Sequence, residues 1–402
     1  MKKNYLLWAL AVVSLAGCSQ NEITEVSPDV HPAVGFSVYT GTQARGAETD
    51  NDAIQGSGKG FGILAYYTGT SNMADVTNSI TPNFMWNQQV TYDSGNSSWN
   101  YTPLKYWPNT AGDKVSFYAY APYLSDQTTS PKIALSANNA TGYPTIKFTI
   151  ASEAKDMVDL VTDSVINQAK TTDNVKFTLK HKLTKAVFKA KLGGDYFKGE
   201  DDANKTKIYI TGVSLVGASS ASTGLFSYAT YKFETGQWDT TTEGGESAPA
   251  ALMTSNYSLA SILNTSSSSS VTVNGTAQNA IEISSSTTAV NLFKTSPTEE
   301  ALYLIPVDYL TGIKKSSKKV QVKLEYCIKT EDGNLNGGSS VVPCEVTVDL
   351  PDDTLIQSTA YTYTFVLGLT EVKVEASVVE NGWVDGNAKG DIDVNVPTKP
   401  AS

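Results

Sequence analysis

The 402-residue sequence has few of the side chains on which most catalytic and metal sites depend. It contains only three cysteines and two histidines. No Cys-x-x-Cys pair is present, which argues against a zinc site. His31 lies in a polar N-terminal stretch, and His181 stands between two lysines in a predicted strand, where a packing or surface role is expected. With no histidine near a candidate nucleophile, we predict that the protein is not an enzyme and needs no metal or cofactor.

Positive charge is also scarce. Lysine and arginine together number 30 against 40 acidic residues, so the formal net charge is −10. Nucleic-acid binding needs clustered basic side chains, and we therefore expect no nucleic-acid partner. Arginine is almost missing, since Arg45 is the only one in the sequence.

Long apolar runs are lacking, apart from a short one near the N-terminus. Lys2 and Lys3 precede an apolar stretch over residues 5–15, which has the length of a signal-peptide core rather than of a membrane span. Leu-Ala-Gly then precedes Cys18, and such small residues favour a lipoprotein signal peptidase. We predict a signal peptide over residues 1–17 and acyl chains on Cys18 that anchor the chain in the outer membrane, exposed at the cell surface. The alternative is an ordinary secretory signal with a chance cysteine.

What the sequence does contain is period-two alternation of apolar and polar residues. Strands with one face toward a core and one toward water have this pattern. Turn residues separate the runs at short intervals, which favours an all-β protein built from sandwiches. Residues 151–168 have weak helical features, and residues 240–249 and 264–270 are predicted loops. The alternating runs include residues 34–38, 114–120, 145–150, 175–179, 186–190, 207–210, 320–324 and 361–365.

The chain is too long for a single core, and its length fits two domains. We place the boundary near residue 171, before the strand that begins at Val175. This gives an N-terminal β-sandwich over residues 46–171 and a C-terminal β-sandwich over residues 172–402.

Cys327 and Cys344 are the cysteines that remain after Cys18. They flank a predicted hairpin centred on residues 332–336. Equal spacing from that centre would place them opposite each other, and export permits a disulfide. A disulfide and two unpaired buried thiols are both open interpretations.

Five segments, taken together in their order along the chain, resemble sequences of the fimbrillin family of the Bacteroidales. Each segment alone is a weak signal, but their order is fairly specific for that family. The resemblance implies two transthyretin-like β-sandwiches in tandem and assembly into type V pili (fimbriae). The segments are Trp-Asn-Tyr-Thr-Pro-Leu-Lys-Tyr-Trp-Pro (99–108), Val-Ser-Phe-Tyr-Ala-Tyr-Ala-Pro (115–122), Phe-Thr-Leu-Lys-His-Lys-Leu-Thr-Lys-Ala (177–186), Tyr-Thr-Tyr (361–363) and the Asn-Gly-Trp ending of residues 378–383.

Arg45 follows the first predicted strand. Its small and polar neighbours, with Gly46 next, favour an extended loop that a protease can enter. The planar guanidinium group lets an Arg-specific protease distinguish it from lysine. The resemblance implies cleavage between Arg45 and Gly46, which releases a lipidated leader over residues 18–45 together with its strand. The alternative is that Arg45 is a plain loop residue.

Loss of the leader strand would expose unpaired backbone groups and core side chains. The apolar side of that strand consists of Val34, Phe36 and Val38. Another subunit's strand can fill such an edge by β-strand addition. A candidate donor strand lies near the C-terminus, where Ile392, Val394 and Val396 alternate with polar residues in the same way. An ordinary terminal strand or an unstructured tail is the alternative.

The sequence therefore predicts a structural fimbrial subunit that supports adhesion. Its expected partners are copies of itself or related subunits, an Arg-specific protease, the outer membrane before cleavage and a host or bacterial surface receptor. A second hypothesis is a surface lipoprotein that does not polymerise, either a glycan- or host-binding adhesin or a tip or anchor subunit. Its candidate stacking surface consists of Trp86, Trp99, Tyr101, Tyr106, Trp107 and Trp238, although aromatic residues also serve as ordinary core and rim residues of sandwiches.

Overall fold

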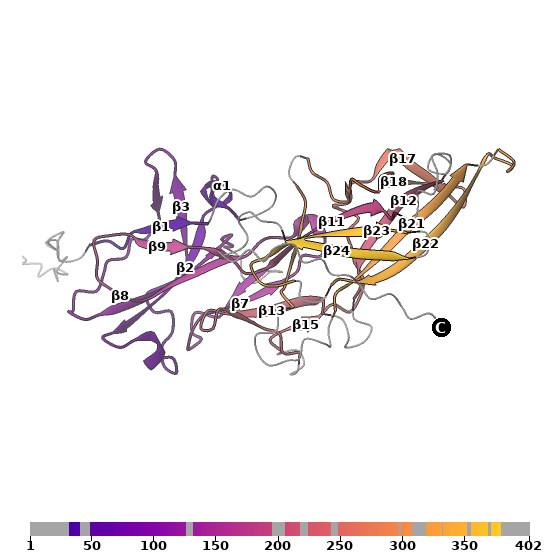
Figure 1. The fold of residues 1–402 in the computed structure, drawn as a ribbon. Coiled ribbons are helices and arrows are strands. Elements are labelled where there is room, and N and C mark those ends of the chain that lie inside the picture. The colour runs from indigo at the N-terminus through magenta and orange to yellow at the C-terminus, as the bar shows by residue number, and fades with distance from the viewer. Residues whose placement is uncertain are drawn as a thin grey trace, which may run out of the picture.

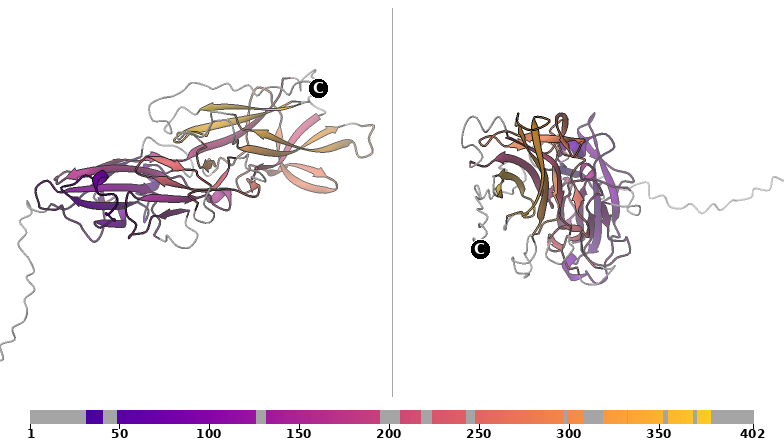
Figure 2. Two further views of the ribbon diagram at one scale, coloured as in Figure 1. Left: turned by 90° about the horizontal axis from the view of Figure 1, so that it is seen from below. Right: turned by 90° about the vertical axis from the view of Figure 1, so that its right-hand side faces the viewer.

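A computed structural model describes residues 32–40, 49–125, 132–194, 206–217, 224–242, 248–296, 299–307, 319–331, 333–351, 355–368 and 371–378. Nearly every element in these ranges is a strand, which confirms the all-β fold class. The helical elements among them are α1 (Asn51–Gln55), η1 (Met73–Asp75) and η2 (Ala154–Asp156). None of these described helices is long and apolar enough to cross a membrane. The molecule is elongated, with β1 and β8 toward one end and the β21–β22 hairpin at the other (Figures 1 and 2).

The N-terminal half is built on a six-stranded antiparallel sheet in the order β10-β8-β5-β2-β3-β4. We call it the N-terminal sheet. Its strands are β2 (Phe61–Gly69), β3 (Met85–Asp93), β4 (Ser98–Asn100), β5 (Lys114–Ala121), β8 (Val161–Ala169) and β10 (Lys180–His181).

A separate parallel pair consists of β1 (Phe36–Tyr39) and β9 (Val175–Thr178). Its apolar side chains and those of the N-terminal sheet form one hydrophobic cluster, which we call the N-terminal core. Its buried members are Val34, Phe36, Ile54, Phe61, Ile63, Ala65, Met85, Val90, Trp107, Val115, Phe117, Ala119, Ala121, Val161, Val175, Phe177 and Leu179.

The two central strands of the N-terminal sheet, β2 and β5, are buried on both faces. Phe61 and Phe117 point into the N-terminal core, whereas Leu64 and Tyr118 belong to a larger core that extends into the C-terminal half. The alternation over residues 114–120 predicted one face in water, and that prediction is wrong for β5. The N-terminal sheet is a middle layer, so its second face meets protein as well.

Three further sheets consist mainly of strands from the C-terminal half, and one of them also includes two strands from the first half. One joins β14 (Gln237–Asp239), β13 (Phe226–Lys232), β7 (Thr145–Thr149) and β6 (Ile133–Leu135), with β15 (Ala251–Leu252) also on β13. A second has the order β19 (Val290–Asn291), β11 (Thr184–Leu192), β23 (Ala360–Leu367), β24 (Val372–Val378), with β20 (Leu302–Leu304) on β11. The third has the order β17 (Ser266–Val273), β18 (Thr276–Ile283), β12 (Thr206–Leu215), β21 (Gln321–Glu331), β22 (Ser339–Asp349), with β16 (Tyr257–Ser258) on β12.

Strand pairings cross the predicted division near residue 171. β10 joins β8 in the N-terminal sheet, and β13 pairs with β7 of the first half. The two-domain assignment with its boundaries stays a prediction. Two local predictions are wrong: the weakly helical segment 151–168 forms η2 and most of β8, and the loop predicted over 264–270 is largely strand β17.

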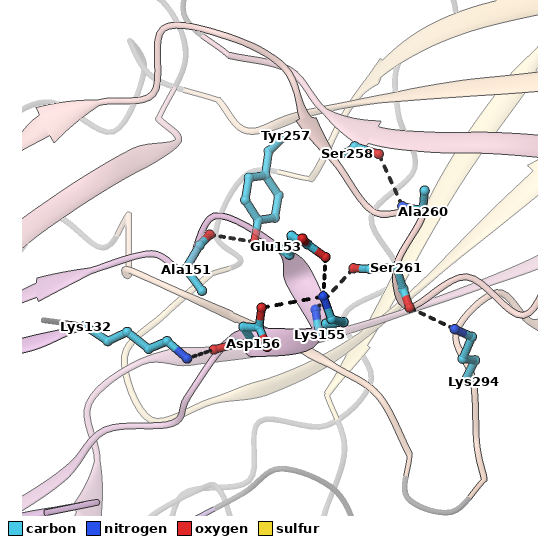
Figure 3. A network of polar contacts seen from close by, with 10 residues as sticks. All are labelled: Lys132, Ala151, Glu153, Lys155, Asp156, Tyr257, Ser258, Ala260, Ser261 and Lys294. Atoms are coloured by element: carbon cyan, nitrogen blue, oxygen red, sulfur yellow. Dashed lines mark hydrogen bonds and ion pairs between the residues drawn. The ribbon is translucent and has the colours of Figure 1, made fainter. Parts of the chain in front are cut away.

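Polar contacts attach the segment before β8 to the C-terminal half (Figure 3). The Tyr257 hydroxyl donates a hydrogen bond to the Ala151 carbonyl oxygen at 2.8 Å. Burial raises the pKa of this hydroxyl above its ordinary value, which keeps its proton in place. The Lys155 amide donates to Ser261 Oγ at 3.2 Å, and the Lys294 ammonium group donates to the Ser261 carbonyl oxygen at 2.8 Å. The bonds to Ala151 and Lys155 help to fix the position of η2 and thus of the start of β8, and the Lys294 bond holds the Ser261 backbone to which η2 is attached.

Lys185 on β11 is an unusual buried cation, with only 9% of its surface exposed. Burial lowers the pKa of its ammonium group to about 8, while the nearby Glu299 carboxylate acts in the opposite direction. In the unfolded chain a lysine titrates near pKa ~10.4. Between about pH 8 and this higher value, the unfolded state binds more protons than the folded state, so folding stability should rise with pH.

We therefore predict that Lys185→Met stabilises the protein at pH 7 by about 1–3 kcal/mol and that this advantage shrinks as pH rises from 8 to 9.5. Denaturant unfolding of both proteins at each pH measures the difference. Lys59→Met, at an exposed position, is the control and should show a constant difference. An advantage of Lys185→Met that does not change with pH would contradict the assigned cause.

Candidate functional site at the first strand

The first strand places alternate side chains into the N-terminal core, as the pattern of residues 34–38 predicted. Val34 and Phe36 are 1% and 2% exposed, and the partly buried Val38 packs against the same core. Tyr39, on the other side of β1, is 48% exposed. The segment Pro32–Thr40, which we call the leader segment, thus supplies core side chains to the sheet that follows it in the chain.

The backbone of the leader segment is bonded along both of its edges. On one edge, the Val175 amide donates to the Gly35 carbonyl oxygen and the Leu179 amide to the Tyr39 carbonyl oxygen, both at 2.8 Å. On the other edge, the Val34 amide donates to the Lys105 carbonyl oxygen at 2.9 Å. We call the space that the leader segment fills, between β9 and residues 101–107, the β1 site.

Three aromatic rings surround the Phe36 side chain. The Phe36 ring centroid lies 5.3 Å from that of Tyr101, 5.7 Å from that of Phe117 and 6.1 Å from that of Phe177. These separations are those of favourable tilted, edge-to-face and stacked aromatic pairs. The Tyr101 hydroxyl also donates to the Val34 carbonyl oxygen at 2.8 Å. Phe36 is therefore the largest side chain by which the leader segment is held.

Side-chain hydrogen bonds hold the chain at both boundaries of the stretch 41–48. Before it, the Thr40 amide and hydroxyl donate to Asn51 Oδ1 at 3.1 and 3.0 Å. After it, the Thr49 amide donates to Asp159 Oδ2 at 3.1 Å, and the Thr49 hydroxyl donates to the Asp159 carbonyl oxygen at 2.8 Å. The first contact joins the leader segment to α1, whereas the second joins Thr49 to the segment just before β8.

His181 takes part in this second attachment. Its Nδ1 lies 2.7 Å from Asp159 Oδ2, and both side chains are almost fully buried. A packing or surface role was expected for His181, but no sequence pattern connects it with Asp159 or Thr49. Asp159 and Thr49 are 110 positions apart in the chain, so only the folded sheet brings them together.

Several predicted site residues lie outside the described residues. These are Cys18, Arg45, Gly46, Ile392, Val394 and Val396. Their roles in lipidation, cleavage and strand donation stay predictions.

Cys327 and Cys344 are not cross-strand partners, which corrects the expected geometry. The register of β21 and β22 pairs Cys344 with Tyr326 and Cys327 with Pro343. Adjacent strand positions point to opposite faces, and both thiols are free in the structure. They line a shallow pocket of about 350 Å³ together with Glu325. Burial raises the pKa of the Cys327 thiol, which lowers its thiolate fraction and its reactivity.

The aromatic residues considered for glycan stacking do not share one environment. Trp107 and Trp238 are buried, and Trp99 and Tyr101 pack against the N-terminal core. Tyr106 is 53% exposed and Trp86 is 37% exposed. Most of this set therefore serves the interior, and it does not form the continuous surface that the second hypothesis requires. Within the described ranges, no group of three or more His, Cys, Asp or Glu side chains is placed to hold a metal ion.

Comparisons with known proteins identify the family of this all-β chain. A model of the fimbrillin-like family matches residues 45–381, and the chain belongs to that family. Among its relatives is the fimbrium subunit Fim1C of Phocaeicola vulgatus, which is 34% identical over 98% of this chain and 100% of the relative. A crystal structure of a fimbrial protein from Bacteroides vulgatus is similar over 88% of this chain and 99% of the other, with 30% identity and a TM-score of 0.68.

The geometry of the β1 site predicts a strong effect of Phe36→Ala on the uncleaved protein. Removal of a fully buried phenyl ring from a packed core is expected to reduce the free energy of unfolding by about 3–5 kcal/mol. Tyr39→Ala, on the exposed side of the same strand, should reduce the free energy of unfolding by about 1 kcal/mol or less. Denaturant unfolding of the three proteins gives both values. Equal losses for the two variants would show that the ring of Phe36 does not hold the leader segment.

Proposed function

We propose that this protein is a structural subunit of a type V fimbria that supports adhesion. It is exported as a lipoprotein through Cys18, cleaved after Arg45 and polymerised by exchange of the leader strand for a strand of another subunit. The observation that carries the proposal is the position of β1. Val34, just before this strand, and Phe36 within it complete the N-terminal core, and the sequence that connects the strand to the rest of the protein contains Arg45.

Cleavage at Arg45 would leave the leader segment attached by non-covalent contacts alone. Those contacts are the backbone bonds to β9 and to residues 101–107, the ring contacts of Phe36 and the Thr40–Asn51 bonds. The body of the protein would keep its own attachment at Thr49, because Asp159 and His181 lie on the body side of the cut. The proposed cut thus separates a replaceable strand from the rest of the protein. The new N-terminal region would stay attached to the fold through the hydrogen bonds of Thr49.

An emptied β1 site would favour the arrival of another strand. It would present the unpaired amides of Val175 and Leu179 and the exposed rings of Phe117 and Phe177. A donor strand would gain about 5 backbone hydrogen bonds of ~1 kcal/mol net each and buried apolar side chains of ~1.5–3 kcal/mol each. The entropy cost of ordering the strand would cancel only part of this gain, so that net binding remains favourable. The sequence Ile392–Val396 supplies such an alternating segment at the far end of the chain.

Family membership supports the same proposal. The relative that matches nearly the full length carries the name of a fimbrium subunit, and the solved structure with a TM-score of 0.68 is that of a fimbrial protein. A fimbrial subunit acts on the cell exterior, which agrees with the predicted signal peptide and lipidated Cys18.

Arg45→Ala should block processing of the full-length protein. The expected product is a lipidated, membrane-bound monomer, because no other arginine is available to an Arg-specific protease. Arg45→Lys is the matched control: it keeps the charge and should resist the same protease. Gel analysis and sequencing of the new N-terminus, expected at Gly46, measure the cut. Normal fibres from Arg45→Ala would remove the cleavage step from the mechanism.

Deletion of residues 387–402 should permit cleavage but stop chain growth, since it removes the candidate donor strand. Deletion of residues 397–402 alone is the control, because it leaves Ile392–Val396 in place. Ladders on a denaturing gel after protease treatment report polymerisation. Unimpaired ladders from the longer deletion would rule out the donor role. Full-length protein that is cleaved but stays monomeric would favour the second hypothesis, a stationary adhesin or a tip or anchor subunit.

A further inference from the structure

The β1 site holds its strand by a pocket that is shaped for an aromatic ring. We propose, on the basis of the proposed function, that this pocket selects the incoming strand. Its preferred occupant is a strand of a related subunit that carries Phe, Tyr or Trp at the Phe36 position, rather than the C-terminal tail of this chain.

The pocket cannot easily shrink around a smaller side chain. Phe117 lies in β5, the most enclosed strand of the N-terminal sheet, and its ring is further supported by Trp107 at a centroid distance of 5.7 Å. Phe177 is carried by β9, where its ring also packs edge-on against that of Phe61 on β2 at a centroid distance of 6.2 Å. The third ring, that of Tyr101, is positioned through its hydroxyl, which accepts a hydrogen bond from the Lys105 amide at 3.2 Å. Because other parts of the protein hold each of these three rings in place, a side chain smaller than phenylalanine would leave unfilled space among them.

The tail of this chain lacks a side chain of the required size. After Trp383 the sequence contains no aromatic residue. If the tail enters with its apolar face inward, Val394, the middle residue of Ile392, Val394 and Val396, lies at the Phe36 position whichever way the strand runs. A shift by two positions places Ile392 or Val396 there instead. In every such register the pocket receives a branched side chain with three or four fewer carbon atoms than phenylalanine.

The neighbouring positions of the site are less selective. A Cβ atom at Gly35 would come within 2.1 Å of Asn174 Oδ1, but Asn174 is exposed and its side chain can turn away. Val38 is only partly buried, near the end of the strand. Discrimination between donor strands therefore resides mainly in the pocket of Phe36. The loss of three or four buried carbons corresponds to binding that is weaker on the order of 10- to 100-fold.

Competition between peptides for the cleaved full-length protein tests this selectivity. The protein is cut with an Arg-specific protease, and a fluorescent peptide with the sequence of residues 33–40 serves as the probe. The competitors are the same peptide unlabelled, its Phe36→Val form, its Tyr39→Val form as the exposed-side control, a tail peptide of residues 390–397 and that tail peptide with Val394→Phe. We expect Phe36→Val and the natural tail peptide to compete 10- to 100-fold less well than the unlabelled peptide. Tyr39→Val should compete within about threefold of it, and Val394→Phe should improve the tail peptide at least about fivefold.

The outcomes separate the selectivity from the proposed function. If the unlabelled peptide and its Phe36→Val form compete equally, strand exchange stands and selection by the aromatic pocket is wrong. If no peptide binds and the cut protein keeps its own leader, the strand-exchange function itself fails, and the selectivity fails with it.

A second measurement uses the intact chain. Val394→Phe should give self-assembled ladders that survive at least about 10 °C more heating in detergent than those of the natural sequence. Asn395→Phe, which adds the same ring to the opposite side of the strand, is the matched control and should give no such gain. Equal heat resistance of the two variants would overturn the assignment of the pocket.

Discussion

The insertion of the Phe36 ring among Tyr101, Phe117 and Phe177 is the interaction on which the N-terminal half depends. The reason lies in the layer structure. The N-terminal sheet is buried on both faces at β2 and β5, so each face needs a cover of apolar side chains. One cover belongs to the larger core that continues into the C-terminal half. The other includes the pair β1–β9, and one strand of that pair lies on the far side of the only arginine in the chain.

The fold class followed from local pattern, whereas the layer order did not. Alternation marks a strand, and the apolar face of β1 was correctly read from Val34, Phe36 and Val38. In β5 the polar-looking positions are buried too: Ser116 is fully buried and accepts a hydrogen bond from the Asn167 amide at 2.9 Å. No local sequence pattern indicates that further protein layers cover the second face of the N-terminal sheet. For the same reason, the weak helical features of residues 151–168 were overridden by the pairing of β8 with β5.

The candidate site was only partly predictable for the same physical reason. Sequence patterns located the leader strand, but its partners come from residues 101–107 and 175–179, far along the chain. The attachment of Thr49 to Asp159 and His181 carries no local signal at all, since it joins side chains from three separate segments. The predicted pairing of Cys327 with Cys344 is wrong by a single position, because the residue opposite Cys344 is Tyr326. In an antiparallel pair, one step changes the face to which a side chain points.

The parallel ladder from Phe36–Val175 to Tyr39–Thr178 has a mechanical consequence. A strand seated in this way and pulled along its own axis loads all of its backbone bonds together, in shear, rather than opening them one after another. Before it can slide by a single step, its central ring must also leave the space among three neighbouring rings. Tension along a filament built from such joints would therefore be borne at each joint by a few bonds acting at once and by one interlocked side chain, so a short contact can resist a large force.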